Sequence, residues 1–324
     1  MIRTIRCLAF SLALFSLLSC HRDGNNGLVP VKFQTDWYPQ PEHGGFYEAL
    51  LKGYYRQEGL DVTILPGGPY VIAEQQVSMG AAQFAMGSSD RILEAVSQGQ
   101  PLVAVGATMQ HDPQGVMMHA GSPVHSFADL EGHTIAIKTG ATWFEYLVAR
   151  YQLKDVHETP ATYSIANFLQ DPNYIQQIFV TSEPFFARKA GADIRTMLIS
   201  ETGYDPYRVV DTSRAFLQQH PDVVAKFVRA SVQGWRDYLA HPDDINAAIA
   251  KLNPAMSVPQ MKFSYEALRD QHFIAGEGPN GADLGRFDPA RWTSMYQQLL
   301  DLKVISKPFD PSIAYTVQFL PKGS

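Results

Sequence analysis

The sequence predicts an α/β protein of two lobes, and three observations lead to this fold class. Short apolar segments alternate with amphipathic segments from Val29 onward, which is typical of strands and helices that share a sheet. The same strand–turn–helix pattern begins again at Phe127. The length of 324 residues exceeds the usual size of a single core. We therefore expect two lobes joined by a hinge, with a ligand cleft between them.

The first lobe is expected to open with a strand–helix–strand unit. A strand over 29–36 precedes a helix over 45–58, in which apolar residues recur at helical spacing. Gly59 ends this helix before a strand over 60–65. The pattern then predicts a helix over 70–79, a strand over 82–87, a helix over 88–99 and a strand over 101–109.

The second lobe is expected to follow a crossing of the chain. We interpret 115–126 as this crossing, and the pattern restarts over 127–153. Further strands are predicted over 178–182 and 195–199, and 201–210 is expected to lead back to the first lobe.

The C-terminal part is predicted to be helical and to pack on the first lobe. The segment 212–244 carries an apolar stripe that includes Trp235, which we expect in the core rather than in a ligand site. The expected lobes are 29–118 plus 206–324 for the first and 119–205 for the second.

The first residues differ from the rest and indicate a targeting segment. Arg3 and Arg6 precede an apolar run that is too short to span a bilayer and that ends in "LLSC" at Cys20. This ending resembles a bacterial lipobox, which implies a signal peptide over 1–19, acylation of Cys20 (with palmitate among the acyl chains) and a tether over 20–28. The alternative is an ordinary signal peptide that happens to contain a cysteine. The expected location is the bacterial periplasm or cell envelope, anchored to the membrane by lipid.

Composition and motifs argue against several classes of function. The net charge of −6, without a long Lys/Arg cluster, lacks the positive surface that a nucleic-acid binder needs. There is no Gly-x-Ser-x-Gly elbow, no Walker phosphate loop and no His-Glu-x-x-His motif, and the ten His residues are dispersed. We expect no enzyme activity, no cofactor and no metal site.

The first candidate binding corner follows the strand over 29–36. Ligands of open α/β sheets bind beyond the carboxyl ends of strands, and this corner places Trp37, Tyr38 and His43 there. Trp37 offers a stacking face, while Gly44 and Gly45 allow close approach of the backbone. The alternative is a buried Trp37 and a structural His43.

Three further corners carry polar candidates. Ser88, Ser89 and Asp90 suit either a helix start or a polar ligand. The same two interpretations apply to Thr139, Gly140 and Thr142, in the corner that begins at Lys138. In the fourth corner, Glu183 either favours the positive end of a helix or accepts hydrogen bonds from ligand N–H groups, and Gln114 supplies an amide near the crossing.

The chain resembles the periplasmic substrate-binding proteins of ABC importers, in the branch shared with thiamine-pyrimidine precursor binding and synthesis. The resemblance rests on "DWYPQPEHGGFYEALLKGYYRQEGLDVTI", "AMGSSDRILEAVSQGQPLVAVGA", "DPQGVMM" and "FADLEGHTIAIKTGATWFEYLV". It implies a type II binding-protein fold, delivery to an ABC permease with an ATPase subunit, and a formylaminopyrimidine or hydroxymethylpyrimidine ligand. Trp37 would then stack on the ring, His43 and Tyr47 would flank it, and Glu183 would hold its amino edge.

Other members of the superfamily leave alternatives open. A related set binds riboflavin, which also needs aromatic faces and hydrogen-bonded edges. Fungal synthases of the superfamily carry a Lys and a His where this chain has Ser89 and Leu93, as well as a Cys-rich motif that this chain lacks. The synthase chemistry is therefore rejected. An alkanesulfonate or nitrate ligand is less favoured, because Asp90 and Glu183 would repel an anion.

Overall fold

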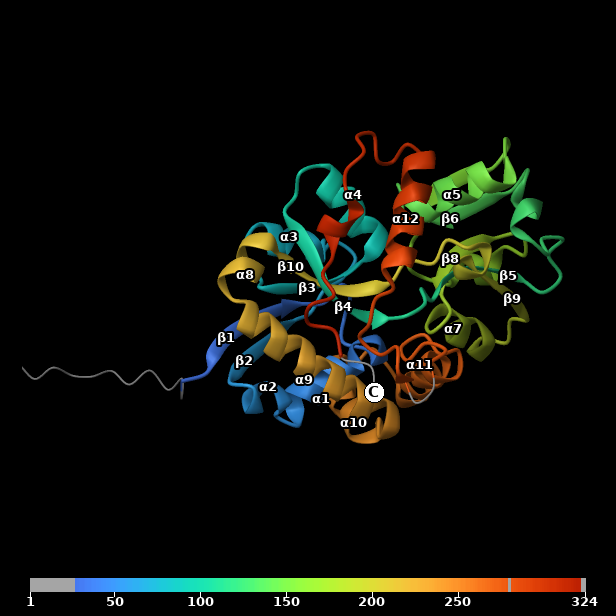
Figure 1. The fold of residues 1–324 in the computed structure, drawn as a ribbon. Coiled ribbons are helices and arrows are strands. Elements are labelled where there is room, and N and C mark those ends of the chain that lie inside the picture. Colours follow the sequence, from blue (N-terminus) through green and yellow to red (C-terminus); the bar gives the residue numbers. More distant parts are fainter. Residues whose placement is uncertain (1–26, 279–280, 322–324) are drawn as a thin grey trace, which may run out of the picture.

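The computed structural model describes residues 27–278 and 281–321. Two α/β lobes lie side by side in Figure 1, and each is built around a five-stranded sheet. The predicted two-lobed α/β fold is therefore confirmed. Cys20, the signal peptide over 1–19 and most of the tether over 20–28 lie outside the described residues.

Sheet 1 combines parallel and antiparallel strands. Its order is β2-β1-β3-β10-β4. The strands are β1 (Val29–Gln34), β2 (Leu60–Leu65), β3 (Phe84–Ser88), β4 (Leu102–Met109) and β10 (Arg208–Ser213). β1 is parallel to β2 and β3, whereas β10, which returns from the other lobe, is antiparallel to β3 and β4.

Sheet 2 repeats this plan in the second lobe, with the order β7-β6-β8-β5-β9. The strands are β5 (Gln114–His119), β6 (Thr134–Ile137), β7 (His157–Pro160), β8 (Ile175–Phe179) and β9 (Ile194–Leu198). β6 is parallel to β7 and β8, and β5 runs antiparallel to β8 and β9. The carboxyl ends of the parallel strands in both sheets are where polar corners were predicted.

Helices cover the sheets of both lobes (Figure 1). Before the first crossing they are α1 (Gly44–Leu51), α2 (Tyr54–Gln57), α3 (Ala73–Ser78) and α4 (Ser89–Ser97). The second lobe contributes α5 (Thr142–Tyr151), α6 (Ala166–Gln170) and α7 (Glu183–Lys189). The C-terminal part adds α8 (Arg214–Gln219), α9 (Pro221–Ala240), α10 (Asp243–Leu252), α11 (Val258–Asp270) and α12 (Pro289–Asp301). Single 3-10 turns occur at η1 (Pro41–His43), η2 (Phe127–Leu130), η3 (Ile199–Thr202) and η5 (Pro311–Ala314).

The α9 stripe fills the core beneath sheet 1. Phe227 stacks on Phe84 of β3 with ring centroids 4.1 Å apart. Trp235 is 2% exposed and contacts the Phe46 ring at 5.7 Å between centroids, so its predicted core position is confirmed. This apolar packing fixes α1 against α9 and thereby places the corner that follows β1.

Several elements differ from the sequence prediction, and β7, α6 and β10 were not predicted as separate elements. The helix expected over 45–58 is interrupted, because Gly53 adopts a left-handed φ of 80° between α1 and α2. The helix expected over 70–79 is reduced to α3. The segment 115–126 is not only a crossing, since most of β5 lies within it and pairs with β8 and β9.

The chain crosses between the sheets after β4 and again before β10. His111 Nδ1 on the first crossing lies 2.7 Å from Asp205 Oδ2 on the second, and Arg291 Nη2 lies 2.8 Å from the same oxygen. These contacts tie the crossings together. The lobe boundaries proposed above remain a prediction, although a division after 118 would cut through β5.

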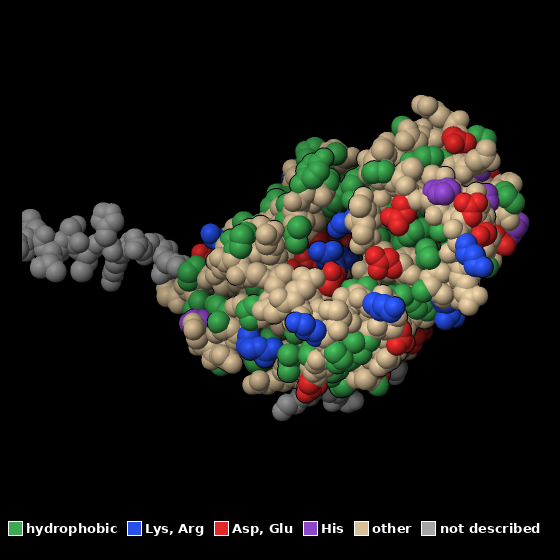
Figure 2. Space-filling view, turned by 90° about the horizontal axis from the view of Figure 1, so that it is seen from above, with side chains coloured by type: hydrophobic (Ala, Val, Ile, Leu, Met, Phe, Trp, Pro, Cys, Tyr) green, Lys and Arg blue, Asp and Glu red, His purple; other side chains and the backbone are tan. Residues whose placement is uncertain are grey.

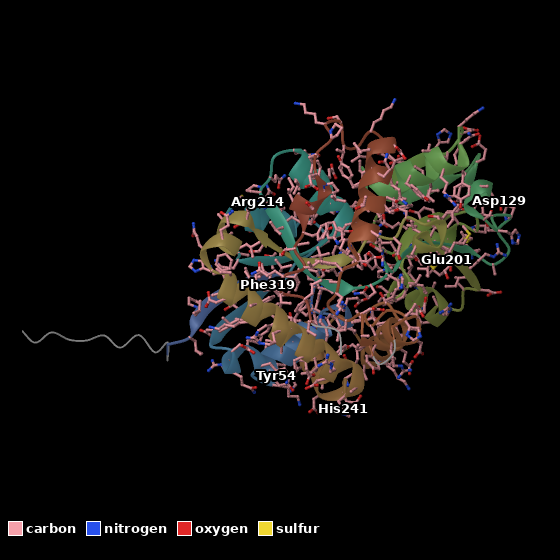
Figure 3. The ribbon with its side chains drawn as sticks, in the orientation of Figure 1. Tyr54, Asp129, Glu201, Arg214, His241 and Phe319 are labelled. Carbon is pink, nitrogen blue, oxygen red and sulfur yellow. The ribbon has the colours of Figure 1, made fainter. Side chains whose placement is uncertain are left out.

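The outer surfaces of the lobes lie away from these crossings. Figure 3 shows Asp129 on the lobe of sheet 2 and Tyr54 and His241 on the lobe of sheet 1. Within the part of the chain that the structure describes, no helix is both long and apolar enough to cross a membrane.

Candidate functional site

Trp37 stands at the corner after β1 and is half-buried. Its ring contacts that of Tyr38, which is 48% exposed, with centroids 5.7 Å apart in an edge-on arrangement. The carbonyl oxygen of Trp37 accepts hydrogen bonds from Thr35 Oγ1 at 2.9 Å and from Gly67 N at 3.0 Å. The corner is thus held by its backbone, and the side chain of Trp37 remains partly exposed.

Tyr163 meets Trp37 from the other lobe. It lies in the loop after β7, and the ring centroids of Trp37 and Tyr163 are 5.4 Å apart with planes inclined at 49°. Tyr163 is 46% exposed and has a left-handed φ of 55°, which is uncommon for a residue other than glycine. The two lobes therefore present one aromatic face each at their boundary.

Asp36 lies beside Trp37 at the centre of a charged cluster. His43 Nε2 is 2.9 Å from Asp36 Oδ1, and Arg208 at the start of β10 forms an ion pair with Asp36 Oδ2. Arg208 Nη1 also lies 3.9 Å from Asp112 Oδ2 on the first crossing. The cluster joins the corner after β1 to both crossings.

The two carboxyl groups of this cluster titrate differently. Burial alone would raise the pKa of Asp36, but the charge of Arg208 and the hydrogen bond with His43 lower it to about 2. Burial raises the pKa of Asp112 to about 6, and the charge of Arg208 opposes this only in part. Asp36 is the ionised partner of Arg208 at neutral pH.

The structure buries two residues that were expected to flank the ligand. His43 is 0% exposed with its Nε2 directed at Asp36, and Tyr47 is 4% exposed within the core. Burial raises the pKa of Tyr47 to about 12. In this structure His43 positions Asp36, and neither ring lies open beside Trp37. Gly44 and Gly45 serve packing, because a Cβ at either position would lie 2.3 Å from a side-chain atom of Tyr238 or Trp235.

The hydroxyl and carboxylate groups of the second corner bond mainly to protein. Ser88 Oγ donates to Asp90 Oδ1 at 2.5 Å, and the Tyr204 hydroxyl donates to Asp90 Oδ2 at 2.7 Å. Ser89 Oγ accepts from the backbone N–H of Tyr207 at 3.0 Å. These bonds connect the start of α4 to the second crossing, as a structural role requires.

The third corner is more open. Thr139 and Gly140 are exposed and Thr142 is half-buried, after the carboxyl end of β6. Gly140 has a left-handed φ of 71°, which favours glycine at this turn. Among the described residues, the hydroxyls of Thr139 and Thr142 have no hydrogen-bond partner in the structure, so they are free for a ligand.

Gln114 is the first residue of β5, and Glu183 is the first residue of α7, which follows the neighbouring strand β8. Glu183 Oε2 accepts from the backbone N–H of Phe179 at 2.9 Å, and burial raises the pKa of Glu183 to about 7 despite this bond. Gln114 Oε1 accepts from Gln177 Nε2 at 3.2 Å, and its backbone N–H donates to Asp112 Oδ1 at 2.9 Å. The Gln114 Nε2 donates a long bond to Asp112 Oδ2 at 3.4 Å, so both ends of this amide are engaged within the protein.

The lobes are also joined behind Glu183. Thr181 is 0% exposed, and its Oγ1 donates to Glu42 Oε1 from the first lobe. Its carbonyl oxygen accepts from Ser264 Oγ of α11 at 2.6 Å. Burial raises the pKa of Glu42.

Sequence reasoning missed three residues that the structure brings to this boundary: Tyr163, Arg208 and Asp112. Tyr163 could have been found, because it follows a strand as Trp37 does. Arg208 and Asp112 gave no such signal, since their roles depend on the return of β10 beside β3 and β4.

Figure 2 shows a hollow between the two lobes in which Lys, Arg, Asp and Glu side chains gather. We call this the interlobe hollow. A separate groove with a volume of about 400 Å³ lies between α7, β9 and α11, and is lined in part by Arg188, Glu201 and Phe263. Within residues 27–278 and 281–321, no group of three or more His, Cys, Asp or Glu side chains is arranged to hold a metal ion. The expected lack of a metal site stays a prediction.

The two-lobed α/β arrangement is a fold that this chain shares with solved structures. The periplasmic aliphatic sulphonate binding protein SsuA of Escherichia coli superposes with a TM-score of 0.61 and 16% identity, over 91% of this chain and 92% of that one. The superposition establishes the fold alone, because the sequence identity is low. The predicted periplasmic binding-protein fold is confirmed.

Residues 40–245 match the family described as NMT1/THI5 like, and the chain belongs to that family. The riboflavin-binding protein RibY of Chloroflexus aurantiacus is 26% identical over 308 residues, 92% of this chain and 88% of the relative. The formylaminopyrimidine-binding protein of Halalkalibacterium halodurans is 24% identical over 310 residues, 92% of this chain and 93% of the relative. A 4-amino-5-hydroxymethyl-2-methylpyrimidine phosphate synthase of Saccharomyces cerevisiae is 21% identical over 313 residues, 86% of this chain and 91% of the relative.

Proposed function

We propose that this protein is the substrate-binding component of an ABC importer and that it captures a flat nitrogen heterocycle between its lobes. The observation that carries the proposal is the approach of Trp37 and Tyr163 from opposite lobes, with 5.4 Å between ring centroids. A planar ligand that enters between these rings would gain stacking on two faces, and the lobes would close on it. The ligand would then pass to a permease driven by an ATPase subunit.

A thiamine pyrimidine precursor, formylaminopyrimidine or hydroxymethylpyrimidine, is the ligand we favour. Glu183 would hold the amino edge of such a molecule through Oε1, and the Gln114 amide would contact it by exchanging its 3.4 Å bond to Asp112 Oδ2. The formylaminopyrimidine-binding relative supports this choice. Riboflavin is the second candidate, favoured by the riboflavin-binding relative of similar coverage.

A binding role without enzyme activity fits the side chains at the site better than a synthase role. Ser89 bonds to the backbone of Tyr207, and Leu93 is 0% exposed in the core, so neither supplies an amine or an imidazole. We further propose that Cys20 carries the lipid that holds the protein at the cell envelope.

The test is a thermal shift assay on the chain from His21 onward. Hydroxymethylpyrimidine, formylaminopyrimidine, riboflavin and an alkanesulfonate are each added at high excess, since a ligand at a hundred times its dissociation constant adds about 2.7 kcal/mol. Stabilisation by the pyrimidines alone supports precursor uptake, whereas stabilisation by riboflavin alone moves the assignment to flavin import. If the alkanesulfonate alone stabilises the protein, the heterocycle proposal is contradicted.

A further inference from the structure

Two positively charged side chains lie on opposite lobes at the carboxyl ends of parallel strands. Arg91 belongs to the first turn of α4, directly after β3, and Lys138 directly follows β6. In this fold class, such positions face the ligand. Neither residue belongs to the aromatic pair.

Arg91 keeps its outer edge free. Its Nε donates to Glu74 Oε1 at 3.0 Å, and its side chain is 42% exposed. Its Nη1 and Nη2 have no hydrogen-bond partner among the described residues. Glu74 therefore orients the guanidinium group while two nitrogens remain for a ligand.

Lys138 is held at its backbone and free at its ammonium group. Its backbone N–H donates to Gln177 Oε1 at 2.9 Å, and Gln177 bonds in turn to Gln114 at 3.2 Å. The ammonium group has no ion-pair partner in the described part of the chain, and the carboxylates of Glu74 and Asp36 act on its charge only at longer range.

The charges on the two lobes act on each other. Burial lowers the pKa of Lys138, and the positive charges of Arg91 and Arg208 lower it further, whereas Glu74 and Asp36 act in the opposite direction. Arg208 is 8% exposed and its buried Nε has no partner among the described residues. An anion between the lobes would relieve this repulsion and bridge both walls of the interlobe hollow.

The nearby carboxylates are engaged by protein groups or partly uncharged, and Glu74 is the ion-pair partner of Arg91. Both oxygens of Asp90 accept hydrogen bonds, from Ser88 and from Tyr204. Burial raises the pKa of Glu183 to about 7, so a large share of this group is uncharged near neutral pH.

We propose that Arg91 and Lys138 form a subsite for an oxyanion group, a phosphate or a sulfonate, on the planar ligand that Trp37 and Tyr163 hold. This inference rests on the proposed function, because it names a second group of the same ligand. The charged ligand would close the lobes more strongly than its uncharged parent.

Isothermal titration with matched pairs of compounds tests the subsite. Riboflavin is compared with riboflavin 5′-phosphate, and hydroxymethylpyrimidine with its phosphate ester, while naphthalene-2-sulfonate presents the charge as a sulfonate. We expect the phosphate ester of the preferred ring to bind at least about tenfold more tightly than the parent. The ratio of the two affinities should decrease as the NaCl concentration rises from about 0.05 to 0.5 M, because salt screens the charges.

The variants Lys138→Gln and Lys138→Arg separate charge from structure. Lys138→Gln should bring the affinity ratio of ester to parent near one, and Lys138→Arg should restore most of it. Lys154→Gln is the matched control, since Lys154 is exposed and its backbone N–H bonds to Glu131 Oε2 at 2.8 Å, at the amino-terminal edge of sheet 2. It should keep the wild-type ratio.

Each possible result of these titrations either supports or overturns the oxyanion subsite. Equal affinities of ester and parent, or a ratio that survives in Lys138→Gln, would overturn the oxyanion subsite and leave the proposed function intact. Binding of naphthalene-2-sulfonate that depends on Lys138 would support the subsite with sulfonate as the anion. Lack of binding by all rings, charged and uncharged, would overturn both the subsite and the heterocycle proposal.

Discussion

The rings of Trp37 and Tyr163 approach to 5.4 Å between centroids although the two residues belong to different lobes. A planar molecule that separates these rings replaces one aromatic contact by two. Under the proposed function, this contact between the lobes is where such a ligand would stack.

Removal of either ring should weaken ligand binding without unfolding the protein. We expect Trp37→Ala and Tyr163→Ala each to lose about 1–3 kcal/mol of binding free energy, the range for stacking of a base on an aromatic side chain. Titration calorimetry with the ligand found by thermal shift measures this loss. Leu252→Ala removes a side chain that is 55% exposed on α10 and should leave affinity unchanged. Full affinity in Trp37→Ala would refute the pocket assignment.

Glu183 should distinguish an aminopyrimidine from a flavin. In Glu183→Gln the amide oxygen can still accept from the Phe179 N–H, which is 2.9 Å from Oε2, so the local fold is expected to survive. Above pH 7, where most of Glu183 is ionised, the variant loses the carboxylate that would accept from an amino group, and its affinity for aminopyrimidines should fall more than its affinity for riboflavin. Calorimetric titration of both ligands compares these losses, and equal losses count against the amino contact.

Gly45 should tolerate no side chain. A Cβ at Gly45 would lie 2.3 Å from ring atoms of Trp235, so Gly45→Ala must displace α1 from α9. We expect a loss of about 1–3 kcal/mol in the free energy of unfolding. Urea denaturation measures it. Gly121→Ala is the control, because a Cβ there meets nothing within 4 Å, and similar stabilities of the two variants would be inconsistent with close packing at Gly45.

Asp112 should make the protein less stable as the pH rises from about 4 to 6. Its pKa is raised by burial from 3.8 to about 6 in the folded protein, so the folded state binds more protons than the unfolded state in this window. The free energy of unfolding should fall by up to about 1.4 kcal/mol per pH unit from this group. Asp112→Asn lacks this contribution, and its stability relative to wild type should therefore rise across the window and then level off.

Chemical denaturation at several pH values tests this dependence. Asp193→Asn, at an exposed position, retains Asp112 and should follow the wild-type profile. Parallel profiles of wild type and Asp112→Asn would contradict a raised pKa at Asp112.

The two-lobed fold could be predicted because its signals are local. Apolar periodicity identified the strands of both sheets as separate elements except β5, β6, β7 and β10, and the α9 stripe correctly placed Trp235 in the core. β5 was missed because its "QGVMMH" segment begins directly after the crossing and its pairing with β8 and β9 is long-range.

The site was less accessible to sequence reasoning. Trp37 could be placed by the corner after β1, but the burial of His43 follows from the packing of η1 against α11 and from the partner Asp36, which no spacing reveals. Arg208 reaches Asp36 only because β10 returns beside β3. Such contacts arise from topology rather than from periodicity.

The Thr181 side chain should prove to form a hydrogen bond that stabilises the contact between the lobes. Its buried hydroxyl donates to Glu42, so Thr181→Val keeps the shape of the side chain but leaves the Glu42 carboxyl group without a partner among the described residues. We expect a loss of about 1–3 kcal/mol in the free energy of unfolding. Small-angle scattering should also show a larger radius of gyration for the ligand-free variant, because the closed arrangement loses a contact. Thr63→Val on the exposed face of β2 is the control, and wild-type stability and size in Thr181→Val would exclude this role.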